Sequence, residues 1–370
     1  MKPRLELWKI FKSNWQGEKM KTSFNIVGFG SKMTDWVIDL KNAERMAFVN
    51  DKLKAIDDSL PQLTSAGGHY DVAEMHTALK SIVVENWKYL GAKKAPGGSV
   101  YNTSNGAKVA ALSMFGQEAR KIAFHHIPTS IVTDALVFNM PPSKQGSDNK
   151  VVREKYLCAN RLPREVKFTS EQIELLADLK TRVVFFPLST PNGYPEQTNM
   201  LLNILEMENS EAKVMATFHG FNAEKNPIKH WPAMNKADAW VGNSKELGHP
   251  SNQEARERFA KDENNLQVVT LGENGLQVTK GNFSKTFPGL NNMGEVKGTA
   301  GAGNGVEGAT LLYLADMFKC SAEENLYALG RLANAAGAAA TTFKGTTLRP
   351  KHASLIRMGY EYQAVHRMPK

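Results

Sequence analysis

The feature that most constrains this chain is a glycine-rich stretch, residues 298–305, that leads directly into an apolar run at residues 306–318. Small residues before a helix let backbone N–H groups approach an anion, and the helix N-terminus adds about half a positive charge there. We call residues 298–305 the glycine cradle, and it predicts a phosphate or oxyanion site formed by Gly301, Ala302 and Gly303. A tight strand-to-helix turn has the same composition and stays open as an alternative.

Short apolar runs alternate with helical patterns through the second half of the chain. The runs at 182–188, 213–218 and 239–242 are typical of buried strands, and helical patterns at 170–180 and 196–208 separate them. Such alternation predicts a mostly parallel sheet with helices on both faces. Right-handed crossovers place the carboxyl ends of the strands along one edge, where we expect a ligand to sit.

Four further motifs adjoin these predicted strands and helices. Two follow strand ends in the second half: Thr270, Gly272 and Gly275 in a Thr-Leu-Gly-x-x-Gly turn, and Asn243 and Glu246 in Asn-x-x-Glu. Two lie nearer the start: Asp35 after the apolar run 24–30, and Gly97, Gly98 and Asn102 before an alanine-rich helical pattern. Each has a plain alternative. A helix N-cap would explain Asp35, a capping box would explain Asn-x-x-Glu, and a Gly-Gly turn is common before any helix.

Taken in order, these motifs resemble those of the ribokinase/PfkB family of sugar and nucleoside kinases, and the early ones are similar to adenosine-kinase-like members. The resemblance covers residues 23–345. It implies a ribokinase-like three-layer α/β/α sandwich with a mostly parallel central sheet and a small lid region within residues 41–165. Residues 1–22 and 346–370 then form basic N-terminal and C-terminal extensions.

The resemblance also implies ligands and residue roles, with ATP and Mg²⁺ as the cofactors. The anion hole and ATP site would use Gly301, Ala302, Gly303, Thr270, Gly272 and Gly275. The substrate site would use Asp35, Gly97, Gly98 and Asn102, with Asp35 on the ribose hydroxyls, because a carboxylate accepts two charge-assisted hydrogen bonds from vicinal hydroxyls. Asn243 and Glu246 would hold Mg²⁺, largely through water.

The cradle departs from the family pattern, Asp-Thr-Thr-Gly-Ala-Gly-Asp, at three positions. Gly298 and Asn304 replace the two acids, and Ala300 replaces a threonine. The last acid of the family motif removes the proton of the acceptor hydroxyl, which the neutral amide of Asn304 cannot do. Loss of a general base costs about 10²- to 10⁴-fold in rate. Three departures in one motif predict a site released from catalysis.

Three functions are consistent with this pattern. The first is a catalytically impaired kinase homologue, a pseudokinase kept as a scaffold or binding subunit of a larger assembly. The alternative is an active ATP-dependent sugar or adenosine-like nucleoside kinase that transfers the γ-phosphoryl group to a hydroxyl. The third is a sensor that binds a nucleoside or nucleotide without turnover.

Charge and hydropathy limit the partners. The net charge of +9 indicates a surface that attracts anions such as nucleotides, nucleic acid or an acidic protein. Lysine and arginine do not form a block interleaved with aromatic residues, which disfavours a dedicated nucleic-acid reader but leaves a protein or ribonucleoprotein assembly open. The chain has no run of about 18 apolar residues, so we expect no membrane span.

The compartment is constrained by the cysteines and the first residues. Cys158 and Cys320 are the only cysteines, which is typical of a reducing intracellular compartment. Residues 1–22 are cationic and amphipathic, as in a mitochondrial leader. Glu6 and Glu18 are unusual for a leader, and an added docking helix stays open as the alternative. The prediction is a cytoplasmic or mitochondrial protein.

Overall fold

A computed structural model describes most of the chain. The described residues are 24–30, 33–65, 68–70, 73–128, 133–141, 143–145, 150–152, 155–159, 181–188, 212–218, 236–248 and 250–365. The predicted N-terminal extension and the helical patterns expected at 170–180 and 196–208 lie outside these residues. No helix in the described part of the chain is both long enough and apolar enough to cross a bilayer.

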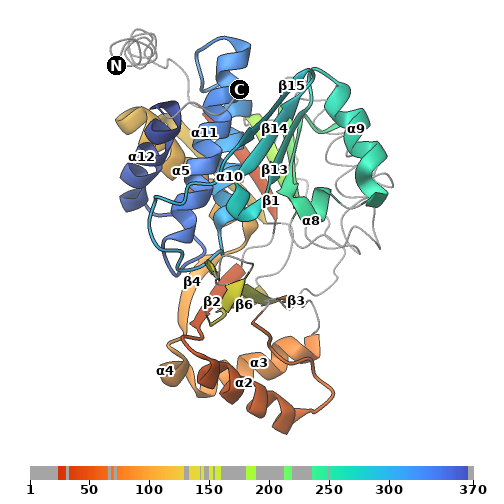
Figure 1. Cartoon of the computed structure of the whole chain (residues 1–370), viewed down its shortest axis with the longest axis vertical. Coiled ribbons are helices and arrows are strands. Elements are labelled where there is room, and N and C mark those ends of the chain that lie inside the picture. The colour runs from red at the N-terminus through yellow and green to blue at the C-terminus, as the bar shows by residue number, and fades with distance from the viewer. Residues whose placement is uncertain are drawn as a thin grey trace.

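An eight-stranded sheet forms the centre of the molecule, in the order β15-β14-β13-β12-β11-β10-β1-β5 (Figure 1). The strands are β1 Phe24–Gly30, β5 Ile122–Pro128, β10 Thr181–Leu188, β11 Lys213–Phe218, β12 Ala239–Asn243, β13 Leu266–Thr270, β14 Leu276–Lys280 and β15 Phe283–Phe287. Every neighbouring pair from β5 to β13 is parallel, and the last two strands add an antiparallel meander.

Helices cover both faces of this sheet. One face carries α5 Ser99–Phe115, α10 Ala302–Leu314, α11 Ala322–Thr341 and α12 Ala353–Val365. The other face carries α8 Ser244–Leu247 and α9 Gln253–Lys261. Alternate residues of the parallel strands enter the two cores, as Ile26 and Val27 do, because successive side chains of a strand point to opposite faces. The predicted three-layer α/β/α sandwich with a mostly parallel sheet is confirmed.

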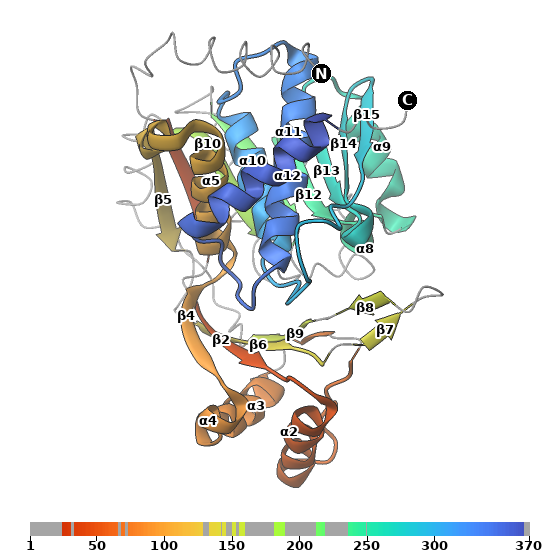
Figure 2. The same cartoon turned by 60° about the vertical axis from the view of Figure 1, so that its left-hand side comes forward.

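A smaller sheet lies beside one edge of the central sheet, and we call this sheet with its helices the lid, although its strand at residues 33–39 precedes the predicted lid range (Figure 2). Its order is β3-β9-β6-β2-β4, with β2 Met33–Asp39, β3 Gly68–Tyr70, β4 Lys93–Gly97, β6 Thr133–Asn139 and β9 Lys155–Ala159. Its outer face is covered by α2 Ala43–Ile56, α3 Ala73–Glu85 and α4 Trp87–Leu90. A hairpin of β7 Ser143–Gln145 and β8 Lys150–Val152 adjoins it.

Short 3₁₀ helices join several of the larger elements. They are η1 Gly116–Lys121, η4 Pro250–Asn252, η5 Gly272–Asn274 and η6 Pro350–His352. After η6 the chain continues into α12, where Ile356 and Tyr360 are buried in the main core. Asn334 of α11 donates to Gln363 of α12 at 2.9 Å. Much of the predicted C-terminal extension therefore packs on the main body, and its boundary at residue 345 stays a prediction.

Helix α10 lies between α5 and α11 at backbone distance. A Cβ on Gly308 would lie 2.3 Å from the backbone nitrogen of Ala107 in α5. A Cβ on Gly305 would lie 2.8 Å from the carbonyl oxygen of Ala336 in α11. Glycine at these positions removes the side chain that would hold the helices apart. The first turn of α10, which belongs to the glycine cradle, is thus fixed by its neighbours on two sides.

Candidate ligand-binding site

The predicted motifs meet at the carboxyl edge of the parallel strands. Asn243 and Thr270 are direct partners in the register of β12 and β13, at the last residue of each strand. The far end of α10 lies at the opposite edge, because Asp316, just beyond it, bonds Lys213 at the start of β11. The first turn of α10 therefore points to the carboxyl edge, beside the lid.

The glycine cradle has the backbone geometry that a close anion contact needs. Gly301 is the N-cap of α10 with φ of 86°, a left-handed conformation that L side chains rarely adopt. A Cβ at Gly301 would lie 2.2 Å from the carbonyl oxygen of Thr346. The backbone N–H groups of Gly303 and Asn304 belong to the first turn, where N–H groups lack a carbonyl partner within the helix. The cradle fits an anionic group on these grounds.

Asn304, for which the family resemblance predicts the base position, has its amide pointing toward α5. The Nδ2 atom of Asn304 lies 3.0 Å from Thr103 Oγ1 and 3.2 Å from Glu307 Oε2. The backbone oxygen of Ser99 lies 3.5 Å away. Thr103 Oγ1 in turn donates to Glu307 Oε2. We call Asn304, Thr103 and Glu307 the α5–α10 network.

Thr103 and Glu307 were not among the predicted site residues. Thr103 is fully buried and Glu307 is 2% exposed, so both are interior groups of the contact between α5 and α10. A signal was present, because Glu307 is the only acid in the apolar run 306–314. Its partner could not be read from the sequence, since Thr103 lies 204 positions earlier.

Asp35 and Gly97 lie together on neighbouring strands of the lid. β2 pairs with β4, and a Cβ on Gly97 would lie 1.9 Å from the Asp35 carboxyl carbon. Asp35 is 4% exposed and lies within β2, so the alternative in which it caps a helix is wrong. Gly98 follows with φ of 87° and is the N-cap of α5. Glycine is required here by the carboxylate and by the turn, whichever ligand is bound.

Asn102 is buried, and a segment near the C-terminus engages it. Thr347 Oγ1 donates to Asn102 Oδ1. The side-chain oxygen that was predicted to bind a sugar is therefore already hydrogen-bonded within the protein. Three residues earlier, Lys344 forms an ion pair with Asp39 of the lid. Residues 343–348 therefore contact the lid, the substrate motif and the cradle, which no local sequence signal predicted. The role of Asn102 toward a sugar stays a prediction.

Phe343 and His352 form a stacked pair next to this segment. Their ring centroids lie 4.3 Å apart with planes 12° from parallel. The backbone N–H of Arg349 donates to His352 Nδ1 at 3.0 Å. Burial, together with the charges of Lys351 and Arg349, lowers the pKa of His352. The imidazole is therefore neutral at physiological pH and acts as an acceptor and a stacking surface.

Asn243 and Glu246 form a capping box at the start of α8. Asn243 Oδ1 accepts from the backbone N–H groups of Lys245 and Glu246, both at 2.9 Å, and Glu246 Oε2 accepts from the Asn243 backbone at 2.9 Å. The capping alternative is thus met, and a role toward Mg²⁺ stays a prediction. Among the described residues no group of three or more His, Cys, Asp or Glu side chains is placed to hold a metal. Mg²⁺ commonly keeps several waters and takes one or two carboxylates plus phosphates, so Glu246 fits it as a single ligand.

The Thr270 motif forms the turn between β13 and β14. Gly272 and Gly275 have φ of 62° and 95°, and the Leu271 N–H donates to the Gly275 oxygen at 2.8 Å. A Cβ on Gly275 would lie 1.9 Å from the Phe287 carbonyl oxygen. These glycines keep the turn compact at the carboxyl edge. ATP contacts at Thr270, Gly272 and Gly275 stay a prediction.

Solved structures of kinases share this architecture. Adenosine kinase from Sinorhizobium meliloti is similar with a TM-score of 0.59 and 15% identity over 91% of this chain and 99% of that chain. A "probable sugar kinase protein" from Rhizobium etli is similar with a TM-score of 0.59 and 18% identity over 93% of this chain and 100% of that chain. Ribokinase from Giardia lamblia has a TM-score of 0.54 and 12% identity over 92% of this chain and 98% of that chain.

The chain has the ribokinase-like fold. No protein-family model and no curated protein sequence matches it. The predicted fold is confirmed by these structures, and identities this low show a shared fold and nothing finer. The ligand of this chain, and whether the chain transfers a phosphoryl group, must therefore be inferred from its own residues.

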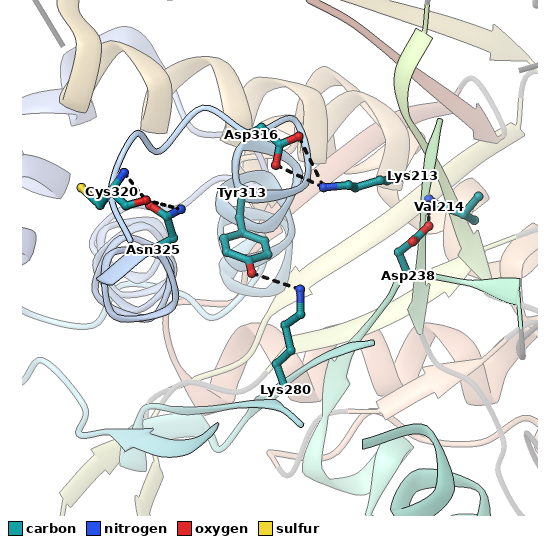
Figure 3. Close-up of polar contacts among 8 residues, drawn as sticks. All are labelled: Lys213, Val214, Asp238, Lys280, Tyr313, Asp316, Cys320 and Asn325. Atoms are coloured by element: carbon teal, nitrogen blue, oxygen red, sulfur yellow. Dashed lines mark hydrogen bonds and ion pairs between the residues drawn. The ribbon is translucent and has the colours of Figure 1, made fainter. Parts of the chain in front are cut away.

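A second polar cluster lies at the amino edge of the sheet, far along α10 from the cradle (Figure 3). Lys213 bonds Asp316 at 3.1 Å, and Lys280 donates to Tyr313 OH at 3.4 Å. Asp238 accepts from the backbone N–H of Val214 at 2.7 Å. Burial raises the pKa of Tyr313 to about 12, so its hydroxyl stays protonated at neutral pH. We call this group the amino-edge cluster.

Proposed function

We propose that this chain is a catalytically impaired kinase homologue, kept as a scaffold or binding subunit with a ligand site at the carboxyl edge. The observation that carries the proposal is the state of position 304. Asn304 cannot accept a proton at working pH, and its amide is turned away into the α5–α10 network. Phosphoryl transfer also depends on positioning and electrostatics, so weak activity is compatible with this loss, whereas efficient activity is not.

Two parts of the site support ligand binding: the glycine cradle and the carboxylate of Asp35. The glycine cradle suits the phosphates of ATP, and Gly301 keeps the conformation that allows close approach. Asp35 is positioned against Gly97 as a carboxylate for vicinal hydroxyls, such as those of a ribose. We therefore propose ATP, with Mg²⁺ near Glu246, and a nucleoside or sugar as the ligands.

The net charge of +9 supports a further part of this proposal, membership in a protein or ribonucleoprotein assembly. In such an assembly the fold would supply shape and a ligand site, and turnover would not be needed. The active-kinase alternative rests on the same cradle and on the same Asp35. Binding and turnover measurements separate the two functions.

The test is calorimetric titration of the protein with ATP, ADP, adenosine and ribose, with and without Mg²⁺, together with an assay of ATP consumption. We expect the protein to bind nucleotide and to turn it over far more slowly than the roughly 1–100 s⁻¹ that is typical of kinases. Turnover at ordinary kinase rates would overturn the proposal in favour of the active enzyme. Absence of any binding would leave only the scaffold.

A matched pair of variants locates the phosphates. Gly303 is exposed, and a Cβ there would meet only Glu307 Oε1, at 4.0 Å. Gly303→Asp and Gly303→Asn have the same shape, but only the first adds a charge at the cradle. We expect Gly303→Asp to bind ATP about tenfold or more weakly than Gly303→Asn, with equal affinity for adenosine. Equal ATP affinity of the two variants would place the phosphates elsewhere.

A further inference from the structure

The amide nitrogen of Asn304 meets only hydrogen-bond acceptors. Its three partners are the oxygen atoms of Thr103, Glu307 and Ser99, at 3.0, 3.2 and 3.5 Å. An amide nitrogen suits this setting because it has two donor hydrogens. A carboxylate oxygen in its place would face three oxygens, of which only the Thr103 hydroxyl can donate, and that hydroxyl already donates to Glu307. The surroundings therefore select asparagine at this position and reject the isosteric acid.

Glu307 supplies the strongest of these acceptors. Its carboxylate is 2% exposed and lies between α5 and α10, where burial of an unpaired charge is costly. Donors from both helices compensate it, namely the Thr103 hydroxyl and the Asn304 amide. In this chain position 304 holds an amide, and an acid lies a single helical turn later, at Glu307.

We propose that Glu307 is a positioning residue that fixes the Asn304 amide and excludes an acid from position 304. The amide at 304 and the buried carboxylate at 307 are then a matched pair, and an acid placed at 304 alone does not fit this site. This inference rests on the proposed function in taking position 304 as the base position. It adds the reason why that position holds an amide.

In Asn304→Asp, a second carboxylate would lie next to that of Glu307, because the atom that it replaces is 3.2 Å from Glu307 Oε2. Two carboxylates this close do not both stay charged near neutral pH inside the protein. One of them binds a proton, and its pKa rises because of the neighbouring charge. The helices are packed at backbone distance here, since a Cβ on Gly106 of α5 would lie 2.6 Å from the Asn304 carbonyl oxygen, so moving them apart to relieve the contact would cost packing energy. An acid at 304 therefore makes the folded state bind an extra proton above the ordinary carboxyl pKa range. Its stability then falls as the pH rises through the raised pKa.

The experiment compares four proteins by thermal unfolding between pH 5 and pH 8.5, without ligand: the unaltered chain, Asn304→Asp, Glu307→Gln and Asn304→Asp/Glu307→Gln. We expect Asn304→Asp to lower the Tm by about 5 °C or more at pH 8, with a smaller loss at pH 5. Adding Glu307→Gln should remove most of the pH-dependent loss, because only one carboxylate then remains. A residue with a merely structural role would not change this pH profile.

Asn105→Asp is the matched control. Asn105 lies on α5 two residues from Thr103, so it points to another side of the helix, and it also donates an amide hydrogen to a carbonyl, that of Tyr101 at 2.8 Å. We expect this control to lose little stability and to show no rescue by Glu307→Gln.

Two outcomes overturn the inference. One is an Asn304→Asp protein as stable as the unaltered chain at pH 8, and the other is a pH-dependent loss that Glu307→Gln leaves in place. If Asn304→Asp does not fold, a folded double variant supports the inference and an unfolded one overturns it. None of these measurements uses nucleotide, so a failure here is distinct from a failure of the proposed nucleotide binding.

Discussion

The two ends of helix α10 place polar groups in opposite settings. At the first turn, the α5–α10 network surrounds one buried carboxylate with donors from two helices. At the last turn, the amino-edge cluster joins Lys213 and Asp316, whose side chains are 39% and 61% exposed. Both groups are held by hydrogen bonds between side chains. They differ in how much water can replace a lost partner.

The difference in burial sets how much stability each contact contributes. A buried group that loses its partner has no water to turn to, so the whole desolvation penalty appears in the free energy of unfolding. An exposed ion pair is screened and contributes little. The carboxyl edge should therefore be intolerant of substitution even without catalysis, and the amino edge should be tolerant. Four substitutions test this contrast.

The largest effect is expected from Gly308→Ala. The new Cβ would lie 2.3 Å from the backbone nitrogen of Ala107, so α5 and α10 must move apart. We expect a loss of about 3 kcal/mol in the free energy of unfolding, measured by urea denaturation. Gly303→Ala in the same helix is the control, and it should change stability by no more than about 1 kcal/mol. Similar losses in both variants would mean that glycine flexibility, and not the helix contact, is responsible.

The next effect is expected from Thr103→Val, which keeps the shape and removes the hydroxyl. Glu307 then loses a buried donor, and we expect a loss of about 2 kcal/mol. Thr279→Val at the amino edge removes a hydroxyl that contacts Ser284 at 3.3 Å on the surface, and it should change stability by less than about 0.5 kcal/mol. Equal costs at the two sites would break the comparison.

Asp238→Asn tests the amino edge by pH, and we expect a smaller effect than that of Thr103→Val. Burial raises the pKa of Asp238 above its ordinary value of 3.8, although Lys213 and Lys280 act in the opposite direction. The folded state thus binds its proton more tightly than the unfolded state. This contribution to stability is full below pH 3.8 and is lost as the pH rises through the raised pKa.

The asparagine variant has no such titration and can still accept from the Val214 N–H. Chemical denaturation from pH 4 to 7.5 should show Asp238→Asn gaining stability relative to the unaltered chain as the pH rises. A relative loss over the same range would show that attraction to the two lysines outweighs burial.

The smallest effect is expected from Lys213→Met. The change removes the ion pair with Asp316 and keeps most of the apolar stem, so we expect a loss below about 1 kcal/mol. The loss should shrink further in 1 M NaCl, where the screening length is about 3 Å. A larger loss that salt does not reduce would mean that the amino-edge cluster behaves like the buried network.

Motif order made the fold predictable. The buried strand runs and the helical patterns between them indicated a parallel sheet, and the strand ends placed Asn243 and the cradle on one edge. These signals are local, because each is a run of residues whose period or composition is set by one element. The register of β12 and β13 then brings Asn243 opposite Thr270 without any further information.

The interior of the candidate site was not predictable in the same way. Glu307 contacts Thr103 across 204 positions, and Lys344 reaches Asp39 across 305. Such pairs depend on how helices and loops pack after the sheet has formed, and no periodicity reports them. Asn304 was recognised as a departure from the family motif, but the sequence could not show that its amide nitrogen bonds three acceptor oxygens.

The position of Asn304 also bears on the chemical ageing of the protein. Asn304 precedes Gly305, and Asn-Gly is a dipeptide in which the following backbone nitrogen can attack the side-chain carbonyl carbon and release ammonia. Here the Gly305 nitrogen donates to the Gly301 oxygen at 3.1 Å, and helical geometry holds it away from that carbon. The packing that fixes the first turn of α10 thus protects the amide from conversion into an acid. Deamidation of Asn304 should therefore be slow in the folded protein and faster in the unfolded chain.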